Sequence, residues 1–276
     1  MSLYDKAFIN MCKDIIVDGH SSVGENVRAV WEDGTPAHTT KKFGVVTRYN
    51  LAKEFPASTL RPINLKAAVD ELLWIYQKKS NNVKDLNSKI WNQWSSSDGS
   101  IGTCYGYIVG KKFKFKNNFV DQTDYILKLL KEDKQSRRMV ISLFNHEFLH
   151  SGNLDPCCWS ITFNVSGKKL NAVLNQRSQD VLVANNWNVA QYAILVHMFA
   201  QVSGLEAGEL IHVIADAHIY DRHIQLVEEL IKREQYNAPK LWINPEVKDF
   251  YKFTVEDFKL IDYKAGEQIK NIPVAI

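Results

Sequence analysis

The chain has 276 residues, a formal net charge of +3, 45% hydrophobic residues and 24% charged residues. This length can bury a full core, and no Pro-, Gly- or Ser-rich stretch is long enough to be a linker, so we expect one domain over residues 1–276. So small a net charge gives no reason to expect nucleic acid or an anionic membrane as partner, but it allows a small anionic substrate.

Several features favour a cytoplasmic protein. The first twenty residues mix charged and apolar side chains through every turn, unlike a signal peptide. The longest apolar stretch, residues 191–205, is interrupted by His197 and Gln201 and is too short to span a bilayer. The four cysteines form no CxxC pair of the kind that binds zinc. We therefore expect free thiols, no metal and no membrane partner.

Apolar periodicity predicts the elements in chain order. Helical spacing marks residues 4–15, 69–76, 126–130, 190–202 and 224–231. Strand-like runs are RMVISLF from Arg138, WSITFNV from Trp159, LNAVLNQ from Leu170 and ELIHVIA from Glu209. The SGKK segment between the second and third runs predicts a hairpin. Because helices and strands interleave irregularly, we predict an α+β fold: a single domain with a large mixed β-sheet and helices packed on it.

One polar cluster follows a predicted strand. The segment LNQRSQD, residues 174–180, places amide, guanidinium, hydroxyl and carboxylate groups where burial is costly unless each finds a partner. A ligand could supply some of those partners, and Arg177 with Ser178 would suit a phosphate. A structural network of ion pairs at the sheet edge would explain the same residues.

Two more clusters leave alternatives open. In IADAHIYDRH, residues 214–223, the side chains of Asp216, His218 and Tyr220 alternate, so they share one face of a strand. They could bind a sugar hydroxyl or, less simply, a metal. Arg137 and Arg138 stand just before a strand, where they could meet one anion or remain solvated.

Aromatic and acidic residues raise similar choices. The segment KKFKFK, residues 111–116, could contact nucleic acid or form a hairpin with one wet face. Trp91, Trp94 and Trp187 could form a platform for a flat heterocycle or pack in the core. Glu71 lies within a helical apolar pattern, where burial would raise the pKa of its carboxyl and suit it to proton transfer.

Taken in order, these segments resemble one family over nearly the whole chain. Arg28 and the motifs DELLW, IWNQW, CYG, SRR, DPC, QRSQD, NVAQY, DAHIYDRH and PVAI are similar to those of folate-dependent thymidylate synthases with a cysteine nucleophile. The resemblance implies reductive methylation of dUMP to dTMP with 5,10-methylenetetrahydrofolate as co-substrate. It also implies a homodimer whose sheets stack face to face, with Arg137 and Arg138 contributed to the partner's site.

The resemblance answers which of the two adjacent thiols reacts. Cys157, directly after Pro156, matches the nucleophile that adds to uracil carbon 6, and a nearby guanidinium would lower its thiol pKa. Cys158 stands where histidine is common in relatives. The implied catalytic residues are Cys157, Glu71, Tyr105, Asn188 and Arg177. The implied dUMP-binding residues are Arg28, Arg137, Arg138, Arg177, Ser178, Gln176, Asp180, Asn188, His218 and Tyr220. The implied folate-binding residues are Ile90, Trp91, Trp94, Asp180, Trp187 and Ala275.

The sequence departs from the family at a few places. Ile214 and Ala215 stand where most members carry two glycines, residues 184–187 replace a block with glycine and Pro-Phe, and Arg61 and Asn64 replace lysine and histidine near the folate tail. None of these changes affects the nucleophile, the phosphate arginines or Asn188.

Two rival functions remain open. A hydroxymethylase of the same fold would let water capture the exocyclic methylene, whereas Trp91 and the hydrophobic C-terminus favour water exclusion and methylation. A nucleotide- or RNA-binding protein without catalysis is the alternative from another class. RNA binding has no support beyond KKFKFK.

Overall fold

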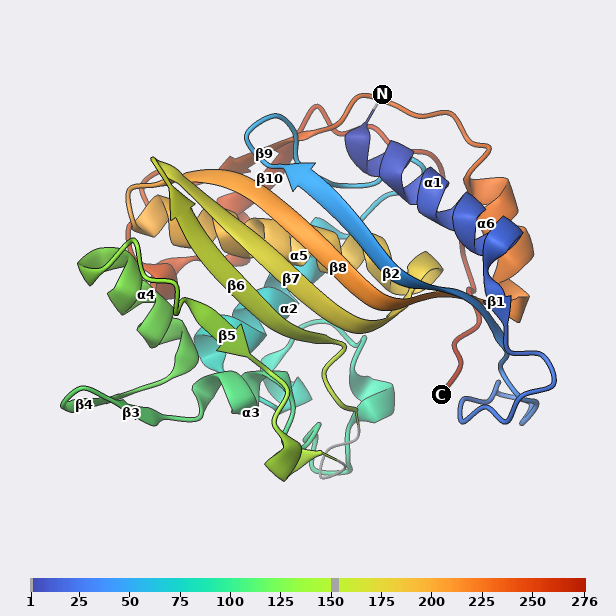
Figure 1. Cartoon of the computed structure of the whole chain (residues 1–276), viewed down its shortest axis with the longest axis horizontal. Helices are drawn as coiled ribbons and strands as arrows, with labels where there is room; N and C mark the ends of the chain where they lie inside the picture. The colour runs from blue at the N-terminus through green and yellow to red at the C-terminus, as the bar shows by residue number, and fades with distance from the viewer. Residues whose placement is uncertain (1, 150–153) are drawn as a thin grey trace.

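The fold is built on one twisted mixed sheet. The computed structural model describes residues 2–149 and 154–276, and within them the large sheet has the strand order β1-β2-β8-β7-β6-β5. The neighbours β7 and β8 run parallel and the other neighbouring strands run antiparallel. Figure 1 shows the long strands side by side across the molecule. The predicted α+β fold with a large mixed sheet is confirmed.

The elements have the following bounds. The strands of the sheet are β1 (His20–Ser21), β2 (Thr39–Asn50), β5 (Val140–Ser142), β6 (Cys158–Ser166), β7 (Lys169–Asp180) and β8 (Glu206–Tyr220). Two small hairpins pair β3 (Phe113–Phe115) with β4 (Asn118–Val120), and β9 (Lys240–Ile243) with β10 (Phe258–Ile261). The helices are α1 (Leu3–Asp18), α2 (Leu65–Leu73), α3 (Tyr105–Gly110), α4 (Gln122–Glu132), α5 (Val181–Val202) and α6 (Ile224–Leu230).

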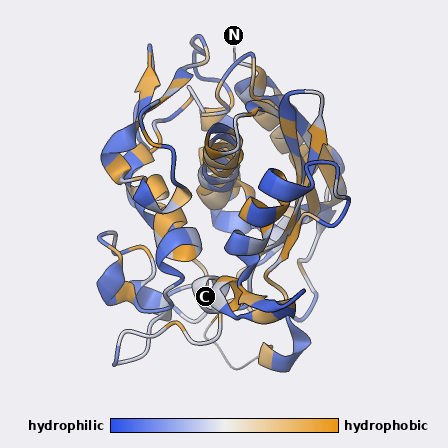
Figure 2. Cartoon of the chain, turned by 90° about the vertical axis from the view of Figure 1, so that its left-hand side faces the viewer, coloured by the Kyte–Doolittle hydropathy of each residue, from blue (hydrophilic) through white to orange (hydrophobic). Residues whose placement is uncertain are grey.

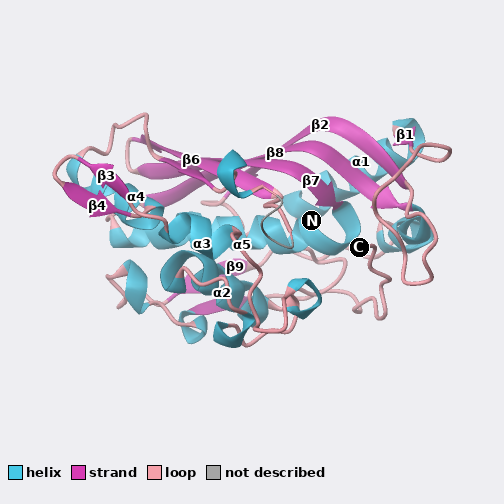
Figure 3. Ribbon diagram, turned by 90° about the horizontal axis from the view of Figure 1, so that it is seen from below, coloured by secondary structure: helices cyan, strands magenta, loops and turns pink. Residues whose placement is uncertain are grey.

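The helix α5 lies at the centre of the layers. Its residues 189–196 are all buried, so it is covered on every side, as expected for a helix that is apolar all round. Figure 3 shows the sheet on one side, α5 and α3 beneath it, and α2 with β9 beyond them. Figure 2 shows hydrophobic segments in both the sheet and the helices, and α5 contacts β7 and β8 of the sheet. The core therefore fills the helix side of the sheet.

No α-helix among the described residues covers the opposite face of the sheet. The long α-helices lie on one side in Figure 3, and residues on the other side keep substantial exposure. Val46 in β2, which pairs with Val213 of β8, is 61% exposed. Apolar side chains gathered on one face of a soluble domain commonly mark an interaction surface.

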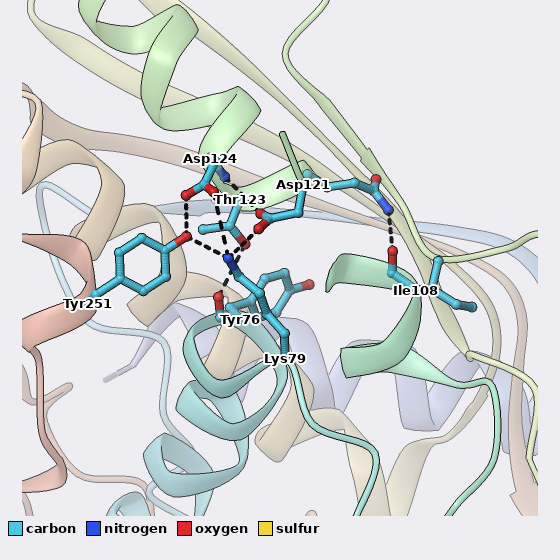
Figure 4. A network of polar contacts seen from close by, with 8 residues as sticks. Tyr76, Lys79, Ile108, Asp121, Thr123, Asp124 and Tyr251 are labelled. Carbon is cyan, nitrogen blue, oxygen red and sulfur yellow. Dashed lines mark hydrogen bonds and ion pairs between the residues drawn. The ribbon is translucent and has the colours of Figure 1, made fainter. Parts of the chain in front are cut away.

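A half-buried lysine joins three distant segments. Lys79 follows a π-helical turn after α2, and its ammonium donates to Asp121 at 2.5 Å and to the Tyr251 hydroxyl at 2.8 Å. The Tyr251 hydroxyl in turn donates to Asp124 at 2.5 Å, and Thr123 donates to the Tyr76 carbonyl. Figure 4 shows these groups converging at the start of α4. Asp121 also caps α4, so one carboxylate serves both contacts.

Several boundaries differ from the sequence prediction. α5 begins nine residues before Ala190, because the intervening Asn185 and Asn186 are buried with hydrogen-bond partners rather than exposed. The strand β2 was not predicted, since its exposed face carries lysine, glycine and arginine among apolar residues. KKFKFK forms part of the β3–β4 hairpin, as the simpler interpretation predicted.

Candidate active site

The two adjacent cysteines occupy different environments. Cys158 begins β6, is 2% exposed, and its thiol donates to Gln176 Oε1 at 3.3 Å. Cys157 lies one residue earlier, is only half-buried, and its Sγ is 3.8 Å from a guanidinium nitrogen of Arg177. Cys157 is therefore the thiol of this pair that a substrate can reach.

Strand β7 holds the Cys157 turn in place. Arg177 donates from Nε to the Pro156 carbonyl at 3.0 Å and from Nη2 to the Asp155 carbonyl at 2.8 Å. The Arg177 backbone N–H donates to the Cys157 carbonyl at 2.9 Å, and the Cys157 N–H donates to the Tyr105 hydroxyl at 2.9 Å. These contacts fix the thiol and the guanidinium relative to each other.

The thiol of Cys157 is subject to opposing influences. Burial raises its pKa above the ordinary value of 9.0, the Arg177 guanidinium lowers it by less, and the Asp155 carboxylate adds a smaller rise. Arg177 thus acts in the expected direction, but the expected net lowering of the thiol pKa is wrong. Desolvation outweighs the single cation at 3.8 Å.

Glu71 is a buried carboxylate held by three N–H donors. Its Oε1 accepts from Trp91 Nε1 at 2.7 Å, and its Oε2 accepts from Trp187 Nε1 at 2.5 Å and Gln191 Nε2 at 2.8 Å. Burial raises the pKa of the carboxyl, and the three donors offset part of that rise. A carboxyl whose pKa is raised in this way is a candidate for proton transfer.

A small cavity connects Glu71 with the other predicted proton-relay residues. It has a volume of about 60 Å³, and its walls include Glu71, Tyr105, Cys158 and Asn188. One water needs about 10–15 Å³ of such space, so a few waters fit. Polar groups from α2, α3, β6 and α5 are therefore brought to one enclosed space.

The amide of Asn188 is oriented by its neighbour. Gln176 Nε2 donates to Asn188 Oδ1 at 3.1 Å and to the Ser178 carbonyl at 3.0 Å. Asn188 Oδ1 thereby keeps one lone pair, and its Nδ2 remains a donor. The pair comes from the end of β7 and the second turn of α5.

The end of β8 forms a separate part of the site. Asp216, His218 and Tyr220 alternate along the strand as predicted, and His218 Nδ1 contacts Asp216 Oδ1 at 2.7 Å. The His218 and Tyr220 rings are 5.1 Å apart. Register pairs Ser178 with Asp216 and Asp180 with His218, so the polar ends of β7 and β8 lie together.

Some predicted residues lie at the edges of this arrangement. Arg28 is exposed in the segment before β2, yet its charge lowers the pKa of Tyr220 against a larger rise from burial. Asp180 caps α5 and lies 3.6 Å from His223. Arg137 and Arg138 are exposed before β5, and within the described ranges no hydrogen bond or ion pair joins them to Cys157.

The predicted folate residues differ in exposure. Trp91 is buried and lies against Trp94 and Tyr105, each with ring centroids 5.6 Å away. Ile90 and Trp94 are more accessible, as is Trp187. Trp91 and Trp187 both donate indole N–H hydrogen bonds to Glu71, so they also hold its carboxylate in position.

The C-terminal residues are anchored beside this region. Ile276 and Val30 exchange backbone hydrogen bonds at 2.9 and 3.0 Å, and the Pro273 carbonyl contacts His223 Nε2 at 2.8 Å. Ala275 lies between these anchors and is partly exposed.

Two contributors were missed in the sequence. Gln191 is the third donor to Glu71, and His212 contacts Gln176 Oε1 at 2.8 Å. The only available signal was a polar residue at a buried position: Gln191 within an apolar helix, and His212 alternating with Leu210 and Ile214. Within the described ranges, no cluster of histidine, cysteine and acidic residues could hold a metal, and no helix is long and apolar enough to cross a membrane.

Comparison with known proteins defines the class to which this fold and site belong. The chain superposes on the thermostable thymidylate synthase A from Bacillus subtilis with a TM-score of 0.95 and 44% identity over 100% of both chains. It is 45% identical to a thymidylate synthase of Bacillus subtilis subsp. natto and 44% identical to one of Clostridium beijerinckii, with 98% of each chain covered. These relatives define the class as the thymidylate synthases, a family of methyltransferases.

The family model described as thymidylate synthase matches residues 6–276. The chain belongs to the thymidylate synthase family.

Proposed function

We propose that this chain converts dUMP to dTMP by covalent catalysis at Cys157, with 5,10-methylenetetrahydrofolate as co-substrate. The co-substrate supplies the one-carbon unit and the hydride, and leaves as dihydrofolate. The observation that carries this proposal is an accessible thiol 3.8 Å from the Arg177 guanidinium, beside a cavity lined by the buried Glu71 carboxylate. A cysteine thiolate is a strong nucleophile and forms covalent intermediates readily.

The first chemical step forms a bond between Cys157 Sγ and carbon 6 of uracil. The thiol gives up its proton, and the carbon 5–carbon 6 π pair becomes an enolate that can attack the one-carbon unit from carbon 5. Because the thiol pKa is raised, the thiolate must be formed at a cost, which Arg177 reduces. When the hydride reaches the new methylene group, the sulfur–carbon bond breaks and its electron pair returns to Cys157.

The proton on carbon 5 must leave between these steps. Its electron pair forms the exocyclic carbon–carbon double bond, while the bond from the one-carbon unit to the folate nitrogen breaks and its electron pair stays on that nitrogen. Glu71 is the acceptor we assign, acting through water in the cavity that it shares with Tyr105 and Asn188. Its three N–H donors offset part of the rise that burial causes in the carboxyl pKa, and so favour the ionised form that can receive a proton. Tyr105 also fixes the Cys157 backbone, which couples the relay to the nucleophile.

The nucleotide would be bound along the ends of β7 and β8. Arg28, Arg177 and Ser178 are assigned to the phosphate. His218 donates from Nδ1 to Asp216, so its Nε2 can accept from the 3′-hydroxyl, with Tyr220 as the second partner. Asn188 is assigned to the uracil edge, supported by Gln176.

We assign the folate to the aromatic side of the site. Ile90, Trp91, Trp94 and Trp187 offer apolar surface, and Ala275 lies on the anchored C-terminal tail. The indole N–H groups of Trp91 and Trp187 are engaged by Glu71, so ring faces rather than N–H groups would meet the pterin. Asp180 is the polar group assigned to the pterin.

We also propose a homodimer formed through the uncovered sheet face. Val46, Val213 and Ile211 are on that face, and stacking of two such faces would bury them. Arg137 and Arg138 are exposed before the edge strand β5, where they can reach phosphate in a partner's site. A nucleophile that must remain a thiol suits a reducing cytoplasm, and residues 1–276 would act as one domain.

The decisive test is product analysis. We expect the purified chain, given dUMP and 5,10-methylenetetrahydrofolate, to form dTMP and dihydrofolate in equal amounts. Formation of the hydroxymethyl nucleotide with tetrahydrofolate would instead identify a hydroxymethylase. The variant Cys157→Ser should lose nearly all turnover, and Cys12→Ser, at a buried site outside the cavity, is the matched control. Full activity of Cys157→Ser would refute the mechanism.

A further inference from the structure

A fully buried histidine lies behind the amide assigned to the pyrimidine. His212 sits in the middle of β8, paired in register with Leu174 of β7, and is 0% exposed. Its Nε2 is 2.8 Å from Gln176 Oε1, while its Nδ1 has no hydrogen-bond partner within the described residues. This histidine is not among the residues that line the cavity around Glu71, and it has no role in the chemistry described above.

The neighbours of Gln176 determine where the proton of His212 resides. Gln176 Nε2 faces the Ser178 carbonyl at 3.0 Å, and a backbone carbonyl can only accept, so this end of the amide must be the NH₂ group. The other end is then the oxygen, which must accept from His212 Nε2 and from Gln179 Nε2 at 3.2 Å. His212 therefore carries its proton on Nε2 and leaves Nδ1 bare.

The charge state of His212 agrees with this assignment. Burial lowers its pKa from 6.5 to about 3, so the ring is neutral under physiological conditions and holds one proton. A bare Nδ1 also costs less to bury without a partner than an unpaired N–H would.

The donor and acceptor roles in these hydrogen bonds also determine how the Asn188 amide is oriented toward the pyrimidine. His212 donates to Gln176, and Gln176 donates to Asn188 Oδ1 at 3.1 Å. Asn188 thereby presents Nδ2 as a donor and one lone pair of Oδ1 as an acceptor, the pattern that pairs with O4 and N3–H of uracil. Cytosine offers the reverse pattern, and would require the amide of Asn188 to flip.

We infer that His212 is a positioning residue that sets uracil-over-cytosine specificity through Gln176 and Asn188. This inference rests on the proposed function, since it requires that Asn188 read the pyrimidine. Loss of the His212 donor removes the shortest contact to Gln176 Oε1 and leaves two longer ones, from Gln179 Nε2 at 3.2 Å and from the Cys158 thiol at 3.3 Å. The amides then flip more easily, which weakens dUMP binding and strengthens dCMP binding.

The test compares dissociation constants for dUMP and dCMP by titration calorimetry on the full-length protein. We expect His212→Leu to reduce the dUMP preference about tenfold, the equivalent of one hydrogen bond. His212→Gln can still donate and should restore most of the preference. His197→Leu is the matched control, because the Nε2 of His197 is also buried without a partner among the described residues and its pKa is lowered to about 4, yet it lies outside this network.

A preference that is unchanged in folded His212→Leu, or equally reduced in His197→Leu, would overturn the inference. A second measurement needs no variant: nitrogen NMR of the wild-type protein should show His212 neutral and protonated on Nε2 from about pH 5 to about pH 8. A proton on Nδ1 would refute the inference even if His212→Leu fails to fold. Failure of the wild type to form dTMP would instead refute the proposed function.

Discussion

At the scale of the residue, two opposing effects determine the pKa of the Cys157 thiol. Burial raises this pKa, and one nearby cation, Arg177, lowers it. Burial raises the thiol pKa above 9.0 and Arg177 offsets only part of the rise. The folded thiol is therefore mostly protonated at neutral pH, and its thiolate fraction grows as pH increases. The nucleophile is protected from casual oxidation and alkylation, since thiolate is the reactive form.

This balance predicts a pH profile. Alkylation of Cys157 by iodoacetamide should accelerate nearly tenfold per pH unit from about pH 7 to about pH 9 without reaching a plateau. Arg177→Gln should slow it further at each pH, because the cation that favours the thiolate is gone. The labelled peptide, identified by mass spectrometry and absent from Cys157→Ser, reports the rate. A plateau well below pH 9 would mean that Arg177 lowers the thiol pKa by more than burial raises it.

Glu71 supports a second prediction at this scale. Glu71→Gln replaces an acceptor-only carboxylate with an amide whose NH₂ must face an indole or amide N–H donor. We expect kcat to fall by about 10²–10⁴-fold while dUMP affinity changes little. Steady-state kinetics and calorimetry measure the two effects. The exposed Glu132→Gln is the control, and an unchanged kcat in Glu71→Gln would exclude Glu71 from proton transfer.

At the scale of the element, Lys79 links the end of α2 and its π turn to the start of α4. The side chain of Lys79 is 18% exposed and that of Asp121 is only 5% exposed. Lys79→Met therefore leaves the Asp121 carboxylate, which also caps α4, without its cation. We expect a loss of about 3 kcal/mol in the free energy of unfolding. Urea denaturation measures it.

The matched control for Lys79 is an exposed pair. Lys66 and Glu256 are 67% and 72% exposed, so Lys66→Met should cost no more than about 1 kcal/mol. Equal losses in the two variants would show that the network at α4 adds no more than a surface ion pair.

The C-terminal tail is a second element with its own prediction. Deleting Ile276 removes both backbone hydrogen bonds to Val30, which anchor the tail beside the site. We expect kcat to fall about 100-fold, because closure and alignment of the substrates are lost, while dUMP affinity stays nearly intact. Turnover assays and calorimetry separate the two. Undiminished turnover would show that the tail is not needed to close the site over the substrates.

Elements that pack against the core could be predicted from the sequence, and elements that face an uncovered surface could not. β6 and β7 were found because their apolar residues alternate against the core, whereas β2 faces an uncovered surface and carries mixed residues. Motif resemblance placed Cys157, Glu71 and Asn188 in one candidate site. The roles of Gln191 and His212 were not predicted. Their hydrogen-bond partners, Glu71 and Gln176, lie 120 and 36 residues away in the sequence.

At the scale of the whole molecule, the uncovered sheet face predicts self-association. Val213→Asp would place a carboxylate at the centre of the proposed interface, where it would be desolvated without a partner. We expect a shift from dimer to monomer in analytical ultracentrifugation and loss of turnover, since the partner's Arg137 and Arg138 would be withdrawn. Val17→Asp, at an exposed position on α1, is the control. A wild type that is monomeric and fully active would refute the shared site.

The most direct test of the whole account is the covalent bond itself. We would mix the enzyme with dUMP and 5,10-methylenetetrahydrofolate, quench in acid within one turnover, and digest the protein for mass spectrometry. The account predicts a nucleotide attached to the peptide that contains Cys157, and on Cys157 rather than Cys158. Formation of dTMP with no adduct, or with the adduct on another cysteine, would contradict it.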